Sequence, residues 1–225
     1  MFVSQSMTRK VITVSKEMTV LEAQALMYEN SIRHLPVVEA DNLLVGIITD
    51  RDIRSALPYR LAMGQSDPQE RAKYAHLRVA DVMSVTPATI MPTHTLQDAL
   101  LLIQEKRVGA FPVVDELGRL KGIISVRDLL RAFINVLGIG EPGTLLCIIV
   151  ENQVGQLKCI VDAITEEGIS FGSVLVARYW EEGKRAVFPY LLTNNVIRIK
   201  KKLKDMGYTL LDPMKWYMDQ LPKSE

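Results

Sequence analysis

The spacing of apolar residues changes character several times along the chain, and each change predicts a new element. Residues 11–14 have the pattern of a short strand. From Thr19, which can cap a helix, apolar residues recur every three or four positions, as in an amphipathic helix. Two compact apolar runs, 35–38 and 43–48, predict strands joined by a polar turn, and a second helix is expected from about residue 50. The pattern predicts a β-α-β-β-α unit.

The same pattern occurs twice. When residues 7–56 are placed over residues 83–132 without a gap, 16 of the 50 positions are identical, against about three expected from average composition. Each copy contains Pro-Val-Val and then Gly-Ile-Ile-Thr/Ser-x-Arg-Asp. One copy alone would expose an apolar sheet, so we expect the two copies to pack face to face around one core.

A Gly- and Pro-rich break at 138–143 separates this duplication from a different pattern. Strand signals at 145–150, 170–179, 186–192 and 208–211, with two helices between them, predict the order β-α-β-β-α-β, which is ferredoxin-like. The expected fold class is α/β (α+β). The predicted segments are 1–57 (repeat 1), 58–77 (a polar, partly helical insertion), 78–137 (repeat 2), 138–143 (linker), 144–213 (second domain) and 214–225 (C-terminal tail).

Composition narrows the class of protein. Of the 225 residues, 48% are hydrophobic and 24% are charged, and the formal net charge is +1. These values are typical of a soluble globular protein and give no reason to expect nucleic acid or a membrane as a partner. The longest apolar run is too short to cross a bilayer, and the first residues lack a secretion signal, so we expect a cytoplasmic location.

Cysteine and histidine are sparse. Cys147 and Cys159 form no CxxC pair, and we expect both to be buried, reduced thiols. The three histidines have no metal-ligand spacing. We predict no metal and no cofactor.

The junction between the last strand and the last helix of each repeat carries the candidate chemistry. Thr49 and Asp52 lie at this junction in repeat 1, and Ser125 and Asp128 lie there in repeat 2. A helix start favours an anion, a hydroxyl can bind phosphate or ribose, and a carboxylate can accept hydrogen bonds from a ribose diol. The same Ser/Thr-x-x-Asp pattern also resembles a capping box that needs no ligand. Both interpretations stay open.

These motifs resemble CBS repeats, and their tandem arrangement resembles a Bateman module over roughly residues 1–135. The resemblance implies adenine-nucleotide binding in two clefts, each built from both repeats. Carried over, the first cleft comprises Thr13, Ile32, Arg33, His34, Pro36, Ser125, Arg127 and Asp128. The second comprises Thr49, Arg51, Asp52, Thr89, Val108, Ala110 and Pro112.

The two clefts should differ in charge. Repeat 1 has Arg33 and His34 before its proline, where repeat 2 has Gly109 and Ala110. Because a guanidinium group binds phosphate through two parallel hydrogen bonds, the first cleft should prefer the more phosphorylated ligand. The alternative for Arg33 and His34 is a solvated strand edge.

The C-terminal pattern, with Gly155 after its first strand, resembles an ACT domain, although Asn152-Gln153-Val154-Gly155 departs from the family's Asp-x-Pro-Gly turn. A CBS pair followed by an ACT-like domain resembles the acetoin-utilisation regulators of bacteria. The alternative for this domain is dimerisation without a ligand.

The sequence contains no GxSxG, no P-loop Gly-Lys-Ser/Thr and no HExxH, so we do not expect an enzyme. We expect a regulatory sensor of adenine nucleotides (ATP, ADP or AMP) that acts on its own C-terminal domain or on a regulated enzyme. A homodimer or dimer of dimers is expected. The alternative is a ligand-free dimerisation and docking protein with degenerate clefts.

Overall fold

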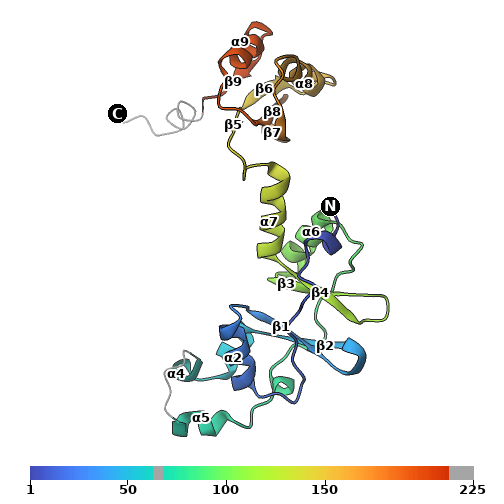
Figure 1. The fold of residues 1–225 in the computed structure, drawn as a ribbon, viewed down its shortest axis with the longest axis vertical. Coiled ribbons are helices and arrows are strands. Elements are labelled where there is room, and N and C mark those ends of the chain that lie inside the picture. Colours follow the sequence, from blue (N-terminus) through green and yellow to red (C-terminus); the bar gives the residue numbers. More distant parts are fainter. Residues whose placement is uncertain (63–67, 213–225) are drawn as a thin grey trace. The chain divides into compact units, whose positions relative to one another are not determined.

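The computed structural model describes residues 1–62 and 68–212. The chain divides into two compact units, Met1–Leu130 and Arg131–Glu225 (Figure 1). This division falls inside helix α7 (Val126–Leu137), ahead of the predicted linker at 138–143. The predicted tail, 214–225, and part of the insertion lie outside the described residues, and the predicted domain bounds stay a prediction.

Each repeat consists of a helix, an antiparallel two-stranded hairpin and a second helix, in the predicted order. Repeat 1 comprises α1 (Val3–Ser6), α2 (Val20–Glu29), β1 (His34–Val38), η1 (Ala40–Asn42), β2 (Leu44–Thr49) and α3 (Asp50–Ala56). Repeat 2 comprises η2 (Val79–Asp81), α6 (Leu96–Lys106), β3 (Ala110–Val114), β4 (Leu120–Ser125) and α7.

The strand expected at 11–14 is wrong in extent, because only Val14 pairs, as a single parallel bridge to Val37. The physical reason is the path of the chain. Thr8 bridges Ile123 of repeat 2, and the residues after it cross to the sheet of repeat 1, so little of this segment remains to pair with β1. Ile90 makes the equivalent single bridge in repeat 2.

The repeats exchange their opening segments, and the contacts occur in pairs 76 positions apart. Thr8 pairs with Ile123 while Ser84 pairs with Ile47, and Phe2 pairs with Thr95 while Arg78 pairs with Thr19. In Figure 1 the start of the chain accordingly lies beside α6 of repeat 2. This reciprocity gives the N-terminal unit the predicted pseudo-symmetric pair.

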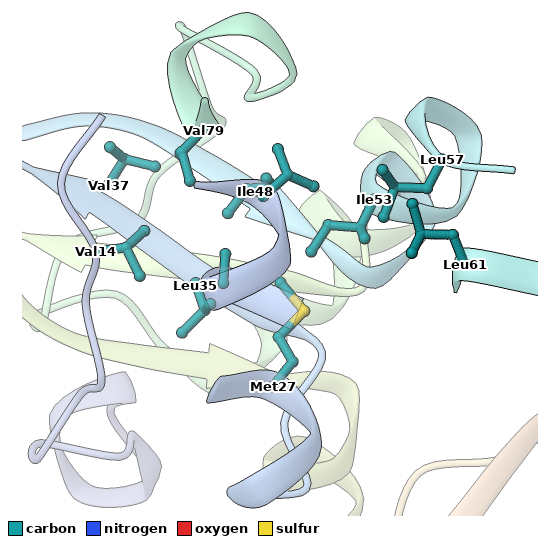
Figure 2. Packing of buried hydrophobic residues seen from close by; sticks show 11 residues of the cluster. Val14, Met27, Leu35, Val37, Ile48, Ile53, Leu57, Leu61 and Val79 are labelled. Atoms are coloured by element: carbon teal, nitrogen blue, oxygen red, sulfur yellow. The ribbon is translucent and has the colours of Figure 1, made fainter. Parts of the chain in front are cut away.

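The buried side chains around Leu35 come from the helices and strands of repeat 1 together with the exchanged segment of repeat 2. Leu35, Ile48 and Val79 are fully buried, and Figure 2 shows Val79 next to Val37 and Ile48. This cluster lies within one repeat and its exchanged segment rather than between two facing sheets. The exchanged Val79 thereby ties repeat 2 into the core of repeat 1.

The insertion is partly helical, as predicted, and it is anchored in that core. Its helices are α4 (Tyr59–Ala62) and α5 (Pro68–Tyr74), and Leu61 is buried in the cluster. Helix α3 ends at Ala56, and the following Leu57 is extended because Pro58 disfavours helical geometry before it.

The C-terminal unit has the predicted order β-α-β-β-α-β, with one strand divided. Its elements are β5 (Thr144–Leu145), β6 (Ile148–Glu151), α8 (Gln156–Glu166), β7 (Phe171–Glu181), β8 (Lys184–Leu191), α9 (Ile197–Asp205) and β9 (Thr209–Leu210). All strand pairs are antiparallel. Strand β6 lies between β9 and β8, and β7 pairs with β8.

The strand expected at 145–150 is interrupted between β5 and β6, although both pieces pair with β8 in one register. Pro189 of β8 lies at the interruption. The Leu146 N–H donates to its carbonyl at 3.0 Å, but proline has no N–H to return the bond.

The expectation of two buried thiols is wrong for one of them. Both cysteines are free, and Cys147 is buried, but Cys159 is exposed. Helix α8 buries Ile160, Ala163 and Ile164, and Cys159 lies off this stripe, because neighbouring helical residues point about 100° apart.

Candidate functional site

Both hydroxyl–aspartate pairs form capping boxes at the starts of α3 and α7. Oδ2 of Asp52 accepts hydrogen bonds from the backbone N–H and the hydroxyl of Thr49, at 2.8 and 2.7 Å. Oδ2 of Asp128 accepts the same bonds from Ser125, at 2.9 and 2.6 Å. Capping is therefore a role that these residues have in the structure, and it does not exclude ligand binding.

The same geometry occurs at two other helix starts. Thr95 and Asp98 form the box that begins α6, with bonds of 2.8 and 2.7 Å, and Thr19 and Glu22 form the box that begins α2. The hydroxyl and backbone bonds lower the pKa of the Asp98 carboxyl. Capping geometry alone thus does not mark a ligand site, and Asp98 provides an internal control.

The prolines of both predicted clefts have structural roles. Pro36 and Pro112 are buried in β1 and β3, and their carbonyls accept hydrogen bonds from Val14 and Ile90 at 3.1 and 3.2 Å. Ala110 is also buried. Pro36, Pro112 and Ala110 are thus packed inside the N-terminal unit as parts of β1 and β3.

A cavity of about 730 Å³ brings together three members of the predicted first cleft, Ile32, Arg33 and Arg127. Arg33 precedes β1 of repeat 1, and Arg127 lies in the first turn of α7 of repeat 2, so the cavity is built from both repeats. Thr13, His34, Pro36, Ser125 and Asp128 do not line it. The residues predicted for the second cleft do not line it either, and their assignment stays a prediction.

Sequence reasoning missed seven of the residues that line this cavity, which lie in α2, in the turn after it and in α3. They are Gln24, Met27, Tyr28, Ser31, Asp50, Ile53 and Arg54. A signal was present in the duplication: Gln24, Asp50 and Arg54 are polar, whereas the equivalent residues of repeat 2 are Leu100, Val126 and Leu130. Among the seven, these three positions are therefore the ones at which repeat 1 is polar and repeat 2 is apolar.

The electrostatics of the cavity favour an anion. It contains three guanidinium groups, and Asp50 is the one carboxylate among its described lining residues. Asp50 already pairs with Arg54 at 3.0 Å, whereas the guanidinium groups of Arg33 and Arg127 form no ion pair with any described residue. Unpaired arginines that line one cavity are suited to phosphate.

His34 lies beside the cavity and shows how the two repeats differ. A Cβ atom on Gly109 would come within 3.0 Å of Nε2 of His34, so the ring occupies space that the missing side chain leaves open. Burial lowers the pKa of the imidazole, and the neighbouring Asp50 and Asp52 oppose this shift. His34 is therefore a half-buried group at the contact between the repeats rather than a lining residue of the cavity.

A second cavity, of about 420 Å³, lies on repeat 2 and contains none of the predicted cleft residues; Met91, Pro92, Thr93, Asp115, Glu116, Leu117 and Lys121 line it. Within residues 1–62 and 68–212, no three His, Cys, Asp or Glu side chains are grouped to hold a metal ion. In the same part of the chain, no helix is long and apolar enough to cross a membrane.

The fold defines a module of two tandem repeats, with a cavity that both repeats line. A family model for the CBS domain matches residues 3–59 and 79–135, which is half of the chain. The chain belongs to the CBS domain family. The prediction of two tandem CBS repeats is confirmed.

Two curated relatives show how far the similarity extends. A CBS domain-containing protein of Dictyostelium discoideum is 35% identical over 135 residues, which is 60% of this chain and 92% of the relative. Inosine-5'-monophosphate dehydrogenase of Methanocaldococcus jannaschii is 37% identical over 123 residues, which is 55% of this chain but 22% of that enzyme. The similarity to the enzyme thus covers a minor part of it.

Among solved structures, a candidate acetoin utilization protein from Vibrio cholerae is 28% identical with a TM-score of 0.52, covering 62% of this chain and 96% of its own. The CBS-pair protein CBSX2 from Arabidopsis thaliana is 26% identical with a TM-score of 0.51, covering 59% and 94%. CBSX2 has a crystal structure in complex with AMP.

Proposed function

We propose that this protein is a regulatory sensor that binds an adenine nucleotide in the 730 Å³ cavity of its CBS pair. The observation that carries the proposal is the convergence of Arg33 and Arg127, unpaired and from different repeats, on one cavity. A phosphate held by both would bridge the repeats, so binding would change how firmly they are joined. Family membership and the AMP complex of CBSX2 support the adenine nucleotide as the ligand class.

Isothermal titration calorimetry of the full-length protein with adenosine, AMP and ATP tests this proposal. We expect ATP to bind, and Arg33→Ala to weaken ATP binding about tenfold or more while adenosine binding changes much less. Arg198→Gln is the matched control, because Arg198 is an exposed helical arginine that does not line the cavity. An equal loss for ATP and adenosine would place Arg33 outside the phosphate site.

The second candidate function is a ligand-free assembly protein, and the observation in its favour is the apolar surface of repeat 2. Leu100, Val126 and Leu130 are 39%, 39% and 60% exposed. Such a surface is suited to a second copy of the chain, which supports the proposed homodimer or dimer of dimers. If neither adenosine, AMP nor ATP binds in the calorimetry, that result would favour this function.

For the C-terminal unit we propose a ferredoxin-like, ACT-like domain that responds to the CBS pair. Its strand order β9-β6-β8-β7, antiparallel throughout, supports this assignment. The likeness to the Vibrio cholerae protein supports a regulatory role in acetoin or carbon metabolism, with an enzyme as the regulated partner. We propose no catalytic activity for this chain.

A further inference from the structure

Arg54 differs from the other two arginines of the cavity because it is already paired. Its Nη2 atom lies 3.0 Å from Oδ2 of Asp50, one helical turn earlier in α3, and the side chains are 52% and 33% exposed. A ligand that enters the cavity therefore meets two unpaired guanidinium groups and a third whose partner is a carboxylate.

The duplicated fold does not need this ion pair. The positions equivalent to Asp50 and Arg54 in repeat 2 are Val126 and Leu130, which cannot form one, and α7 nevertheless extends over 12 residues. A surface pair one helical turn apart contributes little to a helix in any case. The pair is thus a feature of the cavity of repeat 1 rather than of the shared architecture.

The charges suggest what the pair does. One phosphate group can be bound by Arg33 and Arg127 alone, whereas any further phosphate must share the cavity with the carboxylate of Asp50. A phosphate chain carries enough negative charge to take Arg54 from Asp50, because guanidinium groups bind phosphate as they bind carboxylate. A ligand without a second phosphate leaves the pair intact.

We propose that Asp50 is a specificity-determining residue that competes with the ligand for Arg54, so that Arg54 is available only to adenosine polyphosphates. This inference rests on the proposed function, since it concerns the same cavity. It predicts that the pair sets the affinity difference between ATP and AMP, while Arg33 and Arg127 set the affinity that both ligands share.

The experiment is calorimetry of the full-length protein with adenosine, AMP, ATP and inorganic tripolyphosphate. We expect Asp50→Asn to raise ATP affinity about three- to tenfold, and Arg54→Gln to lower it by a similar factor. Adenosine affinity should be unchanged in both variants, and AMP affinity should change less than twofold.

Asp162→Asn and Arg198→Gln are the matched controls. Asp162 pairs with Lys158 on α8 in the same one-turn spacing, and neither control residue lines the cavity. Circular dichroism checks that each variant is folded. Both controls should leave every affinity unchanged.

Equal changes for ATP and AMP, or a loss of ATP affinity in Asp50→Asn, would overturn the competition between Asp50 and the ligand while leaving the proposed function intact. If no probe binds the unmodified protein, the proposed function itself fails. Binding of tripolyphosphate with the predicted response but of no adenosine compound would support the pair's role and overturn the nucleotide as ligand.

Discussion

At the scale of single residues, the hydrogen bonds of Asp52 show a capping role and leave room for a ligand contact. Both hydrogen bonds from Thr49 go to Oδ2, and no described donor bonds to Oδ1, so one oxygen caps α3 while the other can accept a bond from a ribose. A helix cap and a ligand contact are therefore compatible in one carboxylate.

We predict that Asp52→Ala lowers the free energy of unfolding by about 1 kcal/mol and weakens nucleotide binding in the predicted second cleft, which is separate from the 730 Å³ cavity, by about 1.5–3 kcal/mol. Asp98→Ala removes a capping box of the same geometry and should lower the melting temperature without affecting binding. Thermal unfolding and calorimetry on both variants show whether Asp52 only caps α3 or also contacts the ligand. If the two variants behave alike, Asp52 is only a cap, and the same comparison applies to Asp128.

His34 should make stability depend on pH. Its pKa lies below the ordinary value of 6.5 in the folded protein because of burial, so between these two values the unfolded chain binds more protons. The contribution of neutral His34 to the free energy of unfolding is therefore fully present above the ordinary pKa. It is lost as the pH falls toward the lower pKa of the folded protein. Urea unfolding at about pH 7.5 and about pH 5.5 should show a smaller loss in His34→Gln than in the unmodified protein. An identical loss of stability in the two proteins would show that His34 does not cause the pH dependence.

At the scale of elements, the exchanged segments explain the glycine of each Gly-Ile-Ile motif. A Cβ atom on Gly46 would lie 2.7 Å from Sδ of Met83 and 2.9 Å from the carbonyl of Ser84. Gly122 has the same relation to Met7 and Thr8. The glycines thus allow the opening segment of one repeat to lie against the last strand of the other.

We predict that Gly46→Ala lowers the free energy of unfolding by about 1–3 kcal/mol, because Met83 and the backbone of Ser84 must move. Gly140→Ala is the control, since its Cβ atom would have no neighbour within 4 Å. Chemical denaturation measures both variants. An equally small effect of the two substitutions would show that the exchanged segment adapts freely.

At the scale of the whole molecule, the two repeats have diverged on equivalent surfaces. Gln24, Asp50 and Arg54 line a polar cavity in repeat 1, and the exposed residues Leu100, Val126 and Leu130 occupy the same places in repeat 2. One surface is suited to a charged ligand and the other to an apolar partner. This divergence is consistent with a sensor whose second repeat mediates assembly.

We predict that the unmodified protein is at least a dimer, twice the chain mass of 25.3 kDa or more, and that Leu130→Lys shifts it toward the monomer. Leu117→Lys is the control, because Leu117 is 69% exposed in the turn between β3 and β4. Light scattering coupled to size exclusion at micromolar concentration provides the measurement. A monomeric unmodified protein would exclude the assembly.

The periodic pattern and the duplication were sufficient to predict the element order of both units, apart from the strand at 11–14, and the strand–helix junctions. These features depend on the local spacing of apolar residues and on the similarity of the repeats, and both can be read from the sequence alone. Six of the seven missed residues lie on α2 and α3, and Ser31 lies in the turn after α2. Their positions look like ordinary polar surface or core positions, because sequence spacing does not show which surfaces enclose a cavity.

Only the tertiary structure decided which distant residues meet. The exchange of opening segments, the placement of His34 over Gly109 and the interruption of a strand opposite Pro189 all depend on contacts between parts of the chain far apart in sequence. Each results from close packing, in which a missing side chain or a missing N–H on one segment changes what another segment can do. The order of residues determined the repeats of this protein, and their packing determined which residues enclose the cavity.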